Sequence, residues 1–130
     1  MAPPSLLDVG RAHGPFSFVL REVGQGTTTW EYEVDPAHFN PYGVLHGGVL
    51  MGLLDTAMGH AVSELVVPQG RINAAAQLNI NFLLPIRGGR IRAHATVVKI
   101  GKRTAVVEAR ATNEDGAVVG LATSTHSLLP

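Results

Sequence analysis

The 130-residue sequence contains no cysteine, which excludes a disulfide framework, a thiolate nucleophile and a cysteine-ligated metal site. Aromatic residues make up 5% and charged residues 15% of the chain, whereas hydrophobic residues make up 45%. Acidic and basic side chains are equal in number, so the basic excess typical of a general nucleic-acid-binding protein is missing. These proportions favour a compact protein that buries further surface in an oligomer.

The first residues lack the charged stretch and apolar run of a secretory signal, so we expect a cytoplasmic protein. The longest apolar stretch runs from His46 to Val67, and it carries Asp55, Glu64 and four glycines. Such a stretch is typical of a buried helix and not of a membrane span. The length suits one domain over residues 1–130, which can bury about two thirds of its unfolded surface.

Hydrophobic spacing divides the chain at one long helix. Leucine, alanine and methionine recur at helical intervals from about Gly47 to Val66, around most of the helix circumference, so this helix should be largely enclosed and end at Pro68. Before it, alternation predicts strands near 16–21 and 28–34, followed by a loop over 35–45. A short N-terminal helix is expected over residues 5–12.

Four alternating segments follow the helix, and they predict strands. The expected strand positions are about 77–84, 91–98, 105–111 and 119–125. The alternation slips at Val97-Val98, which predicts a β-bulge there. An apolar sheet must cover something, and one enclosed helix is available. The predicted fold is therefore α+β, with an antiparallel sheet of about six strands wrapped around one long central helix. This arrangement resembles the hotdog fold.

Asp55 stands out because an unpaired carboxylate is expensive in an apolar helix. Gly48, Gly52 and Gly59 all fall within about 60° of Asp55 around the helix axis. Each glycine inside a helix costs roughly 1 kcal/mol relative to alanine. Three glycines beside a carboxylate favour a face that a ligand or another backbone approaches closely. A packing contact in which Asp55 caps a nearby backbone amide is an equally weighted alternative.

The helix start, His46-Gly47-Gly48, offers free backbone N–H groups at the positive end of the helix dipole. Such groups can stabilise a thioester carbonyl oxygen as it becomes an oxyanion. Gly47 and Asp55 are separated by about 12 Å of helical rise, so one helix cannot bring both to one atom. Two helices related by a dimer axis could.

The motif His46-Gly47-Gly48, six residues and then Asp55 resembles that of hotdog acyl-CoA thioesterases. The most similar branch is the phenylacetate-degradation and 4-hydroxybenzoyl-CoA group. Asn40 matches a polar position of that branch. The segments 78–89 and 99–103 are similar to the family's strand and turns after the helix.

The resemblance implies a role for each matching position. The Gly47 N–H polarises the thioester carbonyl, and Asp55 of the opposite subunit activates water or attacks the carbonyl directly. Asn40 orients substrate or water, and His46 supports the helix start. The substrate is an acyl-CoA, with coenzyme A at the subunit boundary and no separate cofactor. The protein is then a homo-oligomer, a dimer or a tetramer formed from two dimers.

Further positions are expected to bind substrate. Gly48, Gly59 and Ala75 lie in the matching region, although some relatives place a serine or threonine where Gly59 or Ala75 stands here. The basic residues of two turns could bind the phosphates of coenzyme A: Arg87, Arg90, Lys102 and Arg103. Ordinary solvated turn charges are an equally weighted interpretation.

Two other functions stay open. Residues 37–41 resemble the His-Phe-Pro segment of hotdog dehydratases, which would make His38 catalytic, although the position of their acidic residue falls near Gly52 here. The chain could also be a non-catalytic module that binds a hydrophobic ligand against the helix. No HExxH motif is present, so no metal site is expected. Neither a nucleic acid nor a membrane is expected as a partner.

Overall fold

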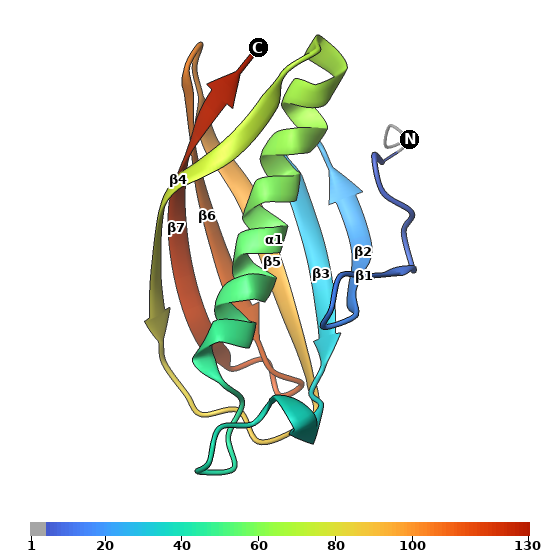
Figure 1. Cartoon of the computed structure of the whole chain (residues 1–130), viewed down its shortest axis with the longest axis vertical. Helices are drawn as coiled ribbons and strands as arrows, with labels where there is room; N and C mark the ends of the chain where they lie inside the picture. Colours follow the sequence, from blue (N-terminus) through green and yellow to red (C-terminus); the bar gives the residue numbers. More distant parts are fainter. Residues whose placement is uncertain (1–4) are drawn as a thin grey trace.

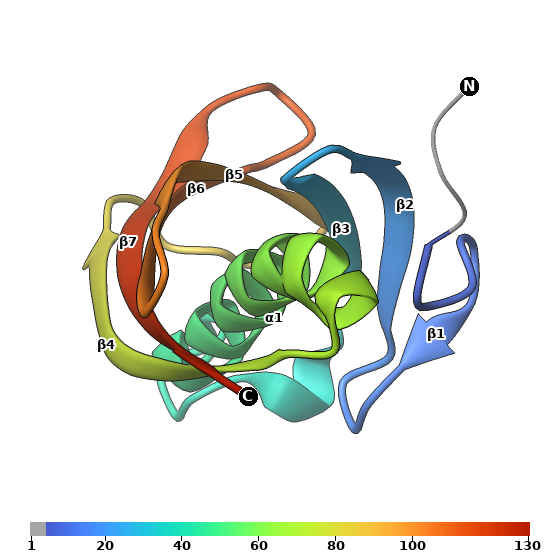
Figure 2. The ribbon, with the colours of Figure 1, turned by 90° about the horizontal axis from the view of Figure 1, so that it is seen from above.

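The computed structural model describes residues 5–130 as a curled antiparallel sheet around one helix, α1 (Gly47–Val66) (Figure 1). Seen along the helix, the sheet encloses α1 on most of its circumference (Figure 2). The strands in chain order are β1 (Ala12–His13), β2 (Phe18–Gly24), β3 (Thr27–Glu33), β4 (Ile72–Phe82), β5 (Arg90–Ile100), β6 (Thr104–Thr112) and β7 (Val118–Leu129). They are arranged in the order β1-β2-β3-β5-β6-β7-β4.

The predicted α+β fold and the predicted helix are confirmed. Leu53, Leu54, Ala57 and Met58 are fully buried, because the side of α1 that carries them packs into the concave face of the sheet. Helix α1 ends where predicted, since Val67–Gln69 forms a 3-10 turn that contains Pro68. The segment Gly47–Gln69 is long and apolar enough to cross a membrane, but 56% of its most apolar window is buried, as in a core helix.

The sheet has register shifts in β5 and β4, and β4 forms one of its edges. The bulge predicted near Val97-Val98 is confirmed by a register shift between Val97 and Lys99. A second shift lies in β4, between Ala75 and Gln77. Strand β4 is the last strand of the sheet and pairs only with β7, so one of its two edges has no partner within residues 5–130. No charged residue occurs in β4.

The N-terminal prediction was wrong. Residues 5–11 form turns and not a helix, and Gly10 adopts a left-handed conformation with φ of 86° while its N–H donates to the Leu20 carbonyl. Leu6 and Leu7 remain exposed, so a helix here would have no buried apolar face. The short strand β1 follows and extends the sheet to seven strands, where about six were predicted.

Candidate active site

Asp55 lies on the open side of α1, which the sheet does not cover. Asp55 and Gly48 are exposed, and Gly52 and Gly59 are half-buried. A Cβ added at Gly52 or Gly59 would find its nearest neighbour at 3.8 Å, which is ordinary van der Waals contact. Packing within the described residues therefore does not require Gly52 or Gly59, whereas a Cβ at Gly48 would come within 3.1 Å of His46 Nδ1. The three glycines leave the helix surface beside the carboxylate without side chains, and we call this surface the glycine stripe (Gly48, Gly52 and Gly59).

At the start of α1, one backbone N–H lacks a partner among residues 5–130. The His46 Nδ1 accepts the Gly48 N–H at 2.9 Å, and the His46 carbonyl accepts the Val49 N–H at 3.0 Å. The Gly47 N–H has no hydrogen-bond partner in the described part of the chain. Since His46 Nδ1 accepts a hydrogen bond, the neutral ring carries its proton on Nε2. The geometry thus makes His46 the helix cap and leaves the Gly47 N–H without a partner among residues 5–130.

Asn40 holds the loop that leads to this helix start. Its Oδ1 accepts the backbone N–H groups of Tyr42, at 2.9 Å, and Val44, at 3.4 Å. Its own N–H donates to the Val44 carbonyl at 2.8 Å. The side-chain oxygen is occupied by the turn, so only the Nδ2 amide can donate to substrate or water.

The four basic residues do not form one cluster. Arg90 begins β5, near the start of α1, whereas Lys102 and Arg103 follow the far end of the strand. Eleven residues of strand separate these positions by roughly 30 Å or more. Arg90 also lies 3.5 Å from the buried carboxylate of Glu31. One bound phosphate group cannot contact both turns of one chain.

Glu31 forms ion pairs with neighbouring arginines on the outer face of the sheet. Its carboxylate is bound by Arg92 at 2.7 Å and by Arg21 at 3.3 Å. Burial alone would raise the pKa of Glu31, but the hydrogen bonds from Arg92 and Arg21 outweigh it and hold this pKa below the ordinary value. This ion-pair group is part of the sheet surface and involves none of the predicted catalytic residues.

His38 is held in place by contacts with the sheet and with the segments on either side of it. Its Nδ1 lies 2.6 Å from the Tyr32 hydroxyl, and its ring packs edge-on against Phe16. The His38 carbonyl accepts the His46 N–H at 3.0 Å, which fixes the loop against the helix start. Gly52, where a dehydratase-like acid would stand, has Phe18 as its nearest neighbour and supplies no carboxylate. These contacts weaken the dehydratase interpretation.

A buried polar network beneath the glycine stripe was not predicted. His126 on β7 is 1% exposed, with Ser124 Oγ 2.9 Å from its Nε2 and Asn73 Nδ2 3.2 Å from its Nδ1. Asn73 also donates to the Gly59 carbonyl at 3.2 Å, which joins the network to α1. Residues 123–127 are all polar, but burial alternates along β7, so that Ser124 and His126 face inward. Their partners on β4 and α1 are distant in sequence.

Burial lowers the pKa of His126 below its ordinary value, and the nearby charge of Asp55 opposes this shift only partly. Below the ordinary histidine pKa of about 6.5, the unfolded chain then binds more protons than the folded chain. We therefore expect the free energy of unfolding to fall as the pH drops from about 7.5 to about 5.5.

Burial lowers the pKa of His60 as well, against the opposing effect of Glu64, so His60 contributes to the slope in the same direction. In His126→Gln the amide can keep both hydrogen bonds without titrating, so the slope should become shallower but not vanish. Chemical denaturation at several pH values measures both slopes. Equal slopes in the two proteins would contradict the assignment to His126.

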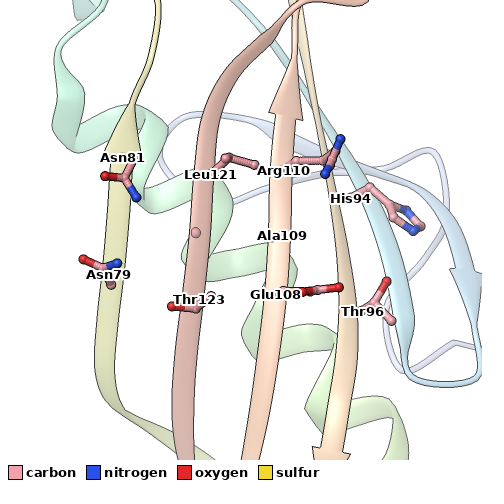
Figure 3. A pocket seen from close by; sticks show the side chains of 10 residues that line it. Asn79, Asn81, His94, Thr96, Glu108, Ala109, Arg110, Leu121 and Thr123 are labelled. Atoms are coloured by element: carbon pink, nitrogen blue, oxygen red, sulfur yellow. The ribbon is translucent and has the colours of Figure 1, made fainter.

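A separate depression of about 520 Å³ lies on the outer face of the sheet, opposite α1 (Figure 3). Its polar lining comes from four neighbouring strands: Asn79 and Asn81, Thr123, Glu108 and Arg110, and His94 and Thr96. None of the predicted site residues lines it. The thickness of the sheet separates this depression from the Gly47 N–H and Asp55, so it is not part of the candidate active site.

The fold and the helix-start motif together define a class of protein. A family model of the thioesterase superfamily matches residues 42–120, which include the loop, the helix and most of the sheet. The chain belongs to the thioesterase superfamily.

Curated relatives agree with this class. A Haemophilus influenzae protein named as a candidate esterase is 36% identical over 73 residues, which cover 56% of this chain and 52% of its own length. The 1,4-dihydroxy-2-naphthoyl-CoA hydrolase of Listeria monocytogenes is 32% identical over 71% of this chain and 74% of its own length. This chain thus spans about half the length of the first of these relatives.

Solved structures show the same fold. A Bacillus halodurans protein determined with CoA is 34% identical over 78% of this chain and 66% of its own, with a TM-score of 0.74. The PaaI protein of Escherichia coli, from the phenylacetic acid degradation operon, is 26% identical over 88% of this chain and 81% of its own, with a TM-score of 0.82.

Proposed function

We propose that this protein hydrolyses an acyl-CoA thioester to the free acid and coenzyme A. The observation that carries the proposal is the Gly47 N–H at the start of α1, which has no partner in the described residues, combined with the exposed carboxylate of Asp55 on the glycine stripe. The hydrolase from Listeria monocytogenes and the CoA complex of the Bacillus halodurans relative support a CoA thioester as the substrate class.

The proposed catalytic unit is a dimer. Strand β4 has eleven residues, no charge and one edge that pairs with nothing in residues 5–130, which makes it a template for pairing with another strand. Pairing with β4 of a second copy would continue the sheet across a two-fold axis. It would also place the two helices side by side, so that Asp55 of one copy can reach the Gly47 N–H of the other. Two such dimers could assemble into a tetramer.

In the proposed reaction, the Gly47 N–H donates to the thioester carbonyl oxygen and stabilises the negative charge that develops there. Asp55 of the other copy removes a proton from a water molecule, which adds to the carbonyl carbon. The carbon–sulfur bond then breaks, and coenzyme A leaves as a thiolate that takes up a proton. Direct attack by Asp55, with hydrolysis of the resulting anhydride, gives the same products.

The residues around Asp55 limit how that water is held. Gly59, one turn along the helix, has no side chain, and Ala75 on β4 has no hydroxyl. We propose that the free Nδ2 amide of Asn40 orients the water or the substrate. Arg87, near the start of α1, is the better placed candidate for the phosphates of coenzyme A, and Lys102 and Arg103 would act only from another copy.

The direct test is release of coenzyme A, followed with a thiol reagent, from phenylacetyl-, 4-hydroxybenzoyl- and hexanoyl-CoA. We expect turnover with at least one of these thioesters, and sedimentation should show a dimer or a larger even assembly. If no thioester is hydrolysed, the proposal is wrong. Hydration of a 2-enoyl-CoA, lost in His38→Ala, would then support the dehydratase class, and ligand binding without turnover would indicate a binding module.

A further inference from the structure

An apolar pocket of about 320 Å³ adjoins the start of α1, between the helix and the end of β4. Its floor is formed by buried Leu45, Leu50 and Ile86. Its rim is formed by Phe82 and Leu83, each about half exposed, and by Leu84. The Leu45 N–H donates to the Ile86 carbonyl at 2.7 Å, which joins the segment before α1 to the segment after β4. Three consecutive exposed hydrophobic residues around a concave floor mark a surface that an apolar group covers.

Gly47 lines this pocket and also carries the free N–H at the start of the helix. A carbonyl oxygen bound at that N–H therefore lies at the mouth of the pocket, and the carbon chain attached to the carbonyl has an apolar cavity directly beside it. We propose that this pocket receives the acyl group, that it selects neutral acyl groups without polar substituents, and that Phe82 limits their size. The inference rests on the proposed thioesterase function.

The lining determines the polarity of the acyl group. All the lining side chains are apolar, so none can donate or accept a hydrogen bond. The lining side chains offer a hydroxyl group no hydrogen bond, so such a group can replace its bonds to water only at exposed backbone atoms. The volume of about 320 Å³ is at the lower end of the ~300–1,000 Å³ of small-ligand pockets, so a small acyl group suits it better than a long one. Benzoyl, phenylacetyl and hexanoyl groups meet both conditions, whereas 4-hydroxybenzoyl meets only the second.

Phe82 is placed to set the size limit. It is the last residue of β4 and pairs with Gly120 of β7. Its ring lies against Gly47, where an added Cβ would come within 3.2 Å of Cε1 and 3.4 Å of Cζ. The ring is 52% exposed, so little of the core depends on it. Truncation of the ring would lengthen the pocket next to the point where the acyl carbonyl is held.

The test compares matched substrates and matched variants by kcat/KM for coenzyme A release. The wild-type protein should prefer benzoyl-CoA over 4-hydroxybenzoyl-CoA by at least about tenfold. Phe82→Ala should raise the ratio of dodecanoyl-CoA to hexanoyl-CoA activity by about tenfold or more. Val98→Ala is the control, because Val98 is similarly exposed, at 57%, but lies on β5 away from the pocket. It should leave the ratio unchanged.

The outcomes separate the two levels of the argument. Absence of turnover with every thioester overturns the proposed function itself. Turnover with equal activity on the benzoyl and 4-hydroxybenzoyl thioesters overturns the proposed polarity of the pocket while the thioesterase function stands. A chain-length ratio that changes equally in Phe82→Ala and Val98→Ala overturns the role of Phe82. Should Phe82→Ala fail to fold, Phe82→Leu keeps an apolar side chain at the rim and should shift the ratio in the same direction.

Discussion

Replacement of Asp55 by asparagine is expected to lower kcat for thioester hydrolysis by about 10²–10⁴-fold, the usual contribution of a positioned acid–base group. Asparagine has nearly the size and shape of aspartate, but it can neither accept a proton from water nor attack the carbonyl. Asp55 is exposed on the open side of α1, so the substitution should leave the fold and the assembly intact. Coenzyme A release at saturating substrate measures the effect.

The control is Asp115→Asn, which alters an exposed carboxylate in the turn between β6 and β7. It should have the activity of the unmodified protein. Equal, nearly full activity in both variants would mean that a different residue activates water, and Asn40 and His46 would then be the next positions to test. A loss of activity in Asp55→Asn together with a changed sedimentation profile would point to an assembly defect and would contradict the catalytic assignment.

Local chemistry explains why the helix and most strands could be predicted. Helix α1 has the predicted bounds because its apolar spacing is continuous from Gly47 and because Pro68 cannot extend it. The slip in alternation at Val97-Val98 is a property of the strand itself, so it also revealed the bulge. In contrast, residues 5–12 contain leucines without any surface to bury them, and the expected helix does not form.

The candidate site also contains parts that local sequence could predict and parts that it could not. Asp55, its neighbouring glycines and the helix start lie within fourteen residues of one another, so helical geometry alone places them. The contact between His126 and Asn73 joins residues 53 positions apart, and the pocket beside Gly47 requires the end of β4 to meet the first turn of α1. Such arrangements depend on sheet order, which the pattern of single segments does not specify.

The exposure of Asp55 bears on the role that we propose for the glycine stripe. In a single copy the carboxylate faces solvent, and its burial cost is avoided. Nothing in the described residues packs closely against Gly52 or Gly59, so we infer that the contact which these two glycines permit comes from another molecule. A second copy paired along β4 and a bound thioester would both approach this side of the helix. The glycines of the stripe then lower the intrinsic stability of the helix but allow a partner or a substrate to approach it closely.

Gly59→Ala and Gly59→Leu test this interpretation directly. The free energy of unfolding and the activity should change in opposite directions. An alanine Cβ would have its nearest neighbour, His126 Cε1, at 3.8 Å, so Gly59→Ala should raise the free energy of unfolding by up to about 1 kcal/mol. The added methyl group projects from the stripe one turn from Asp55. Because a displacement of about 1 Å can cost roughly 10²-fold in rate, we expect kcat/KM to fall in Gly59→Ala and further, by about 10²-fold, in Gly59→Leu.

Denaturant unfolding, coenzyme A release and sedimentation velocity on the same three proteins separate the possible contacts. Lower activity with an intact dimer would mean that the substrate approaches Gly59, because the partner then still fits. Lower activity with loss of the dimer would mean that the backbone or side chains of the second copy lie against it. Full activity in Gly59→Leu would show that nothing approaches this part of the helix closely, and the functional reading of Gly59 would be wrong. A partner or substrate would then approach Asp55 only beside Gly48 and Gly52.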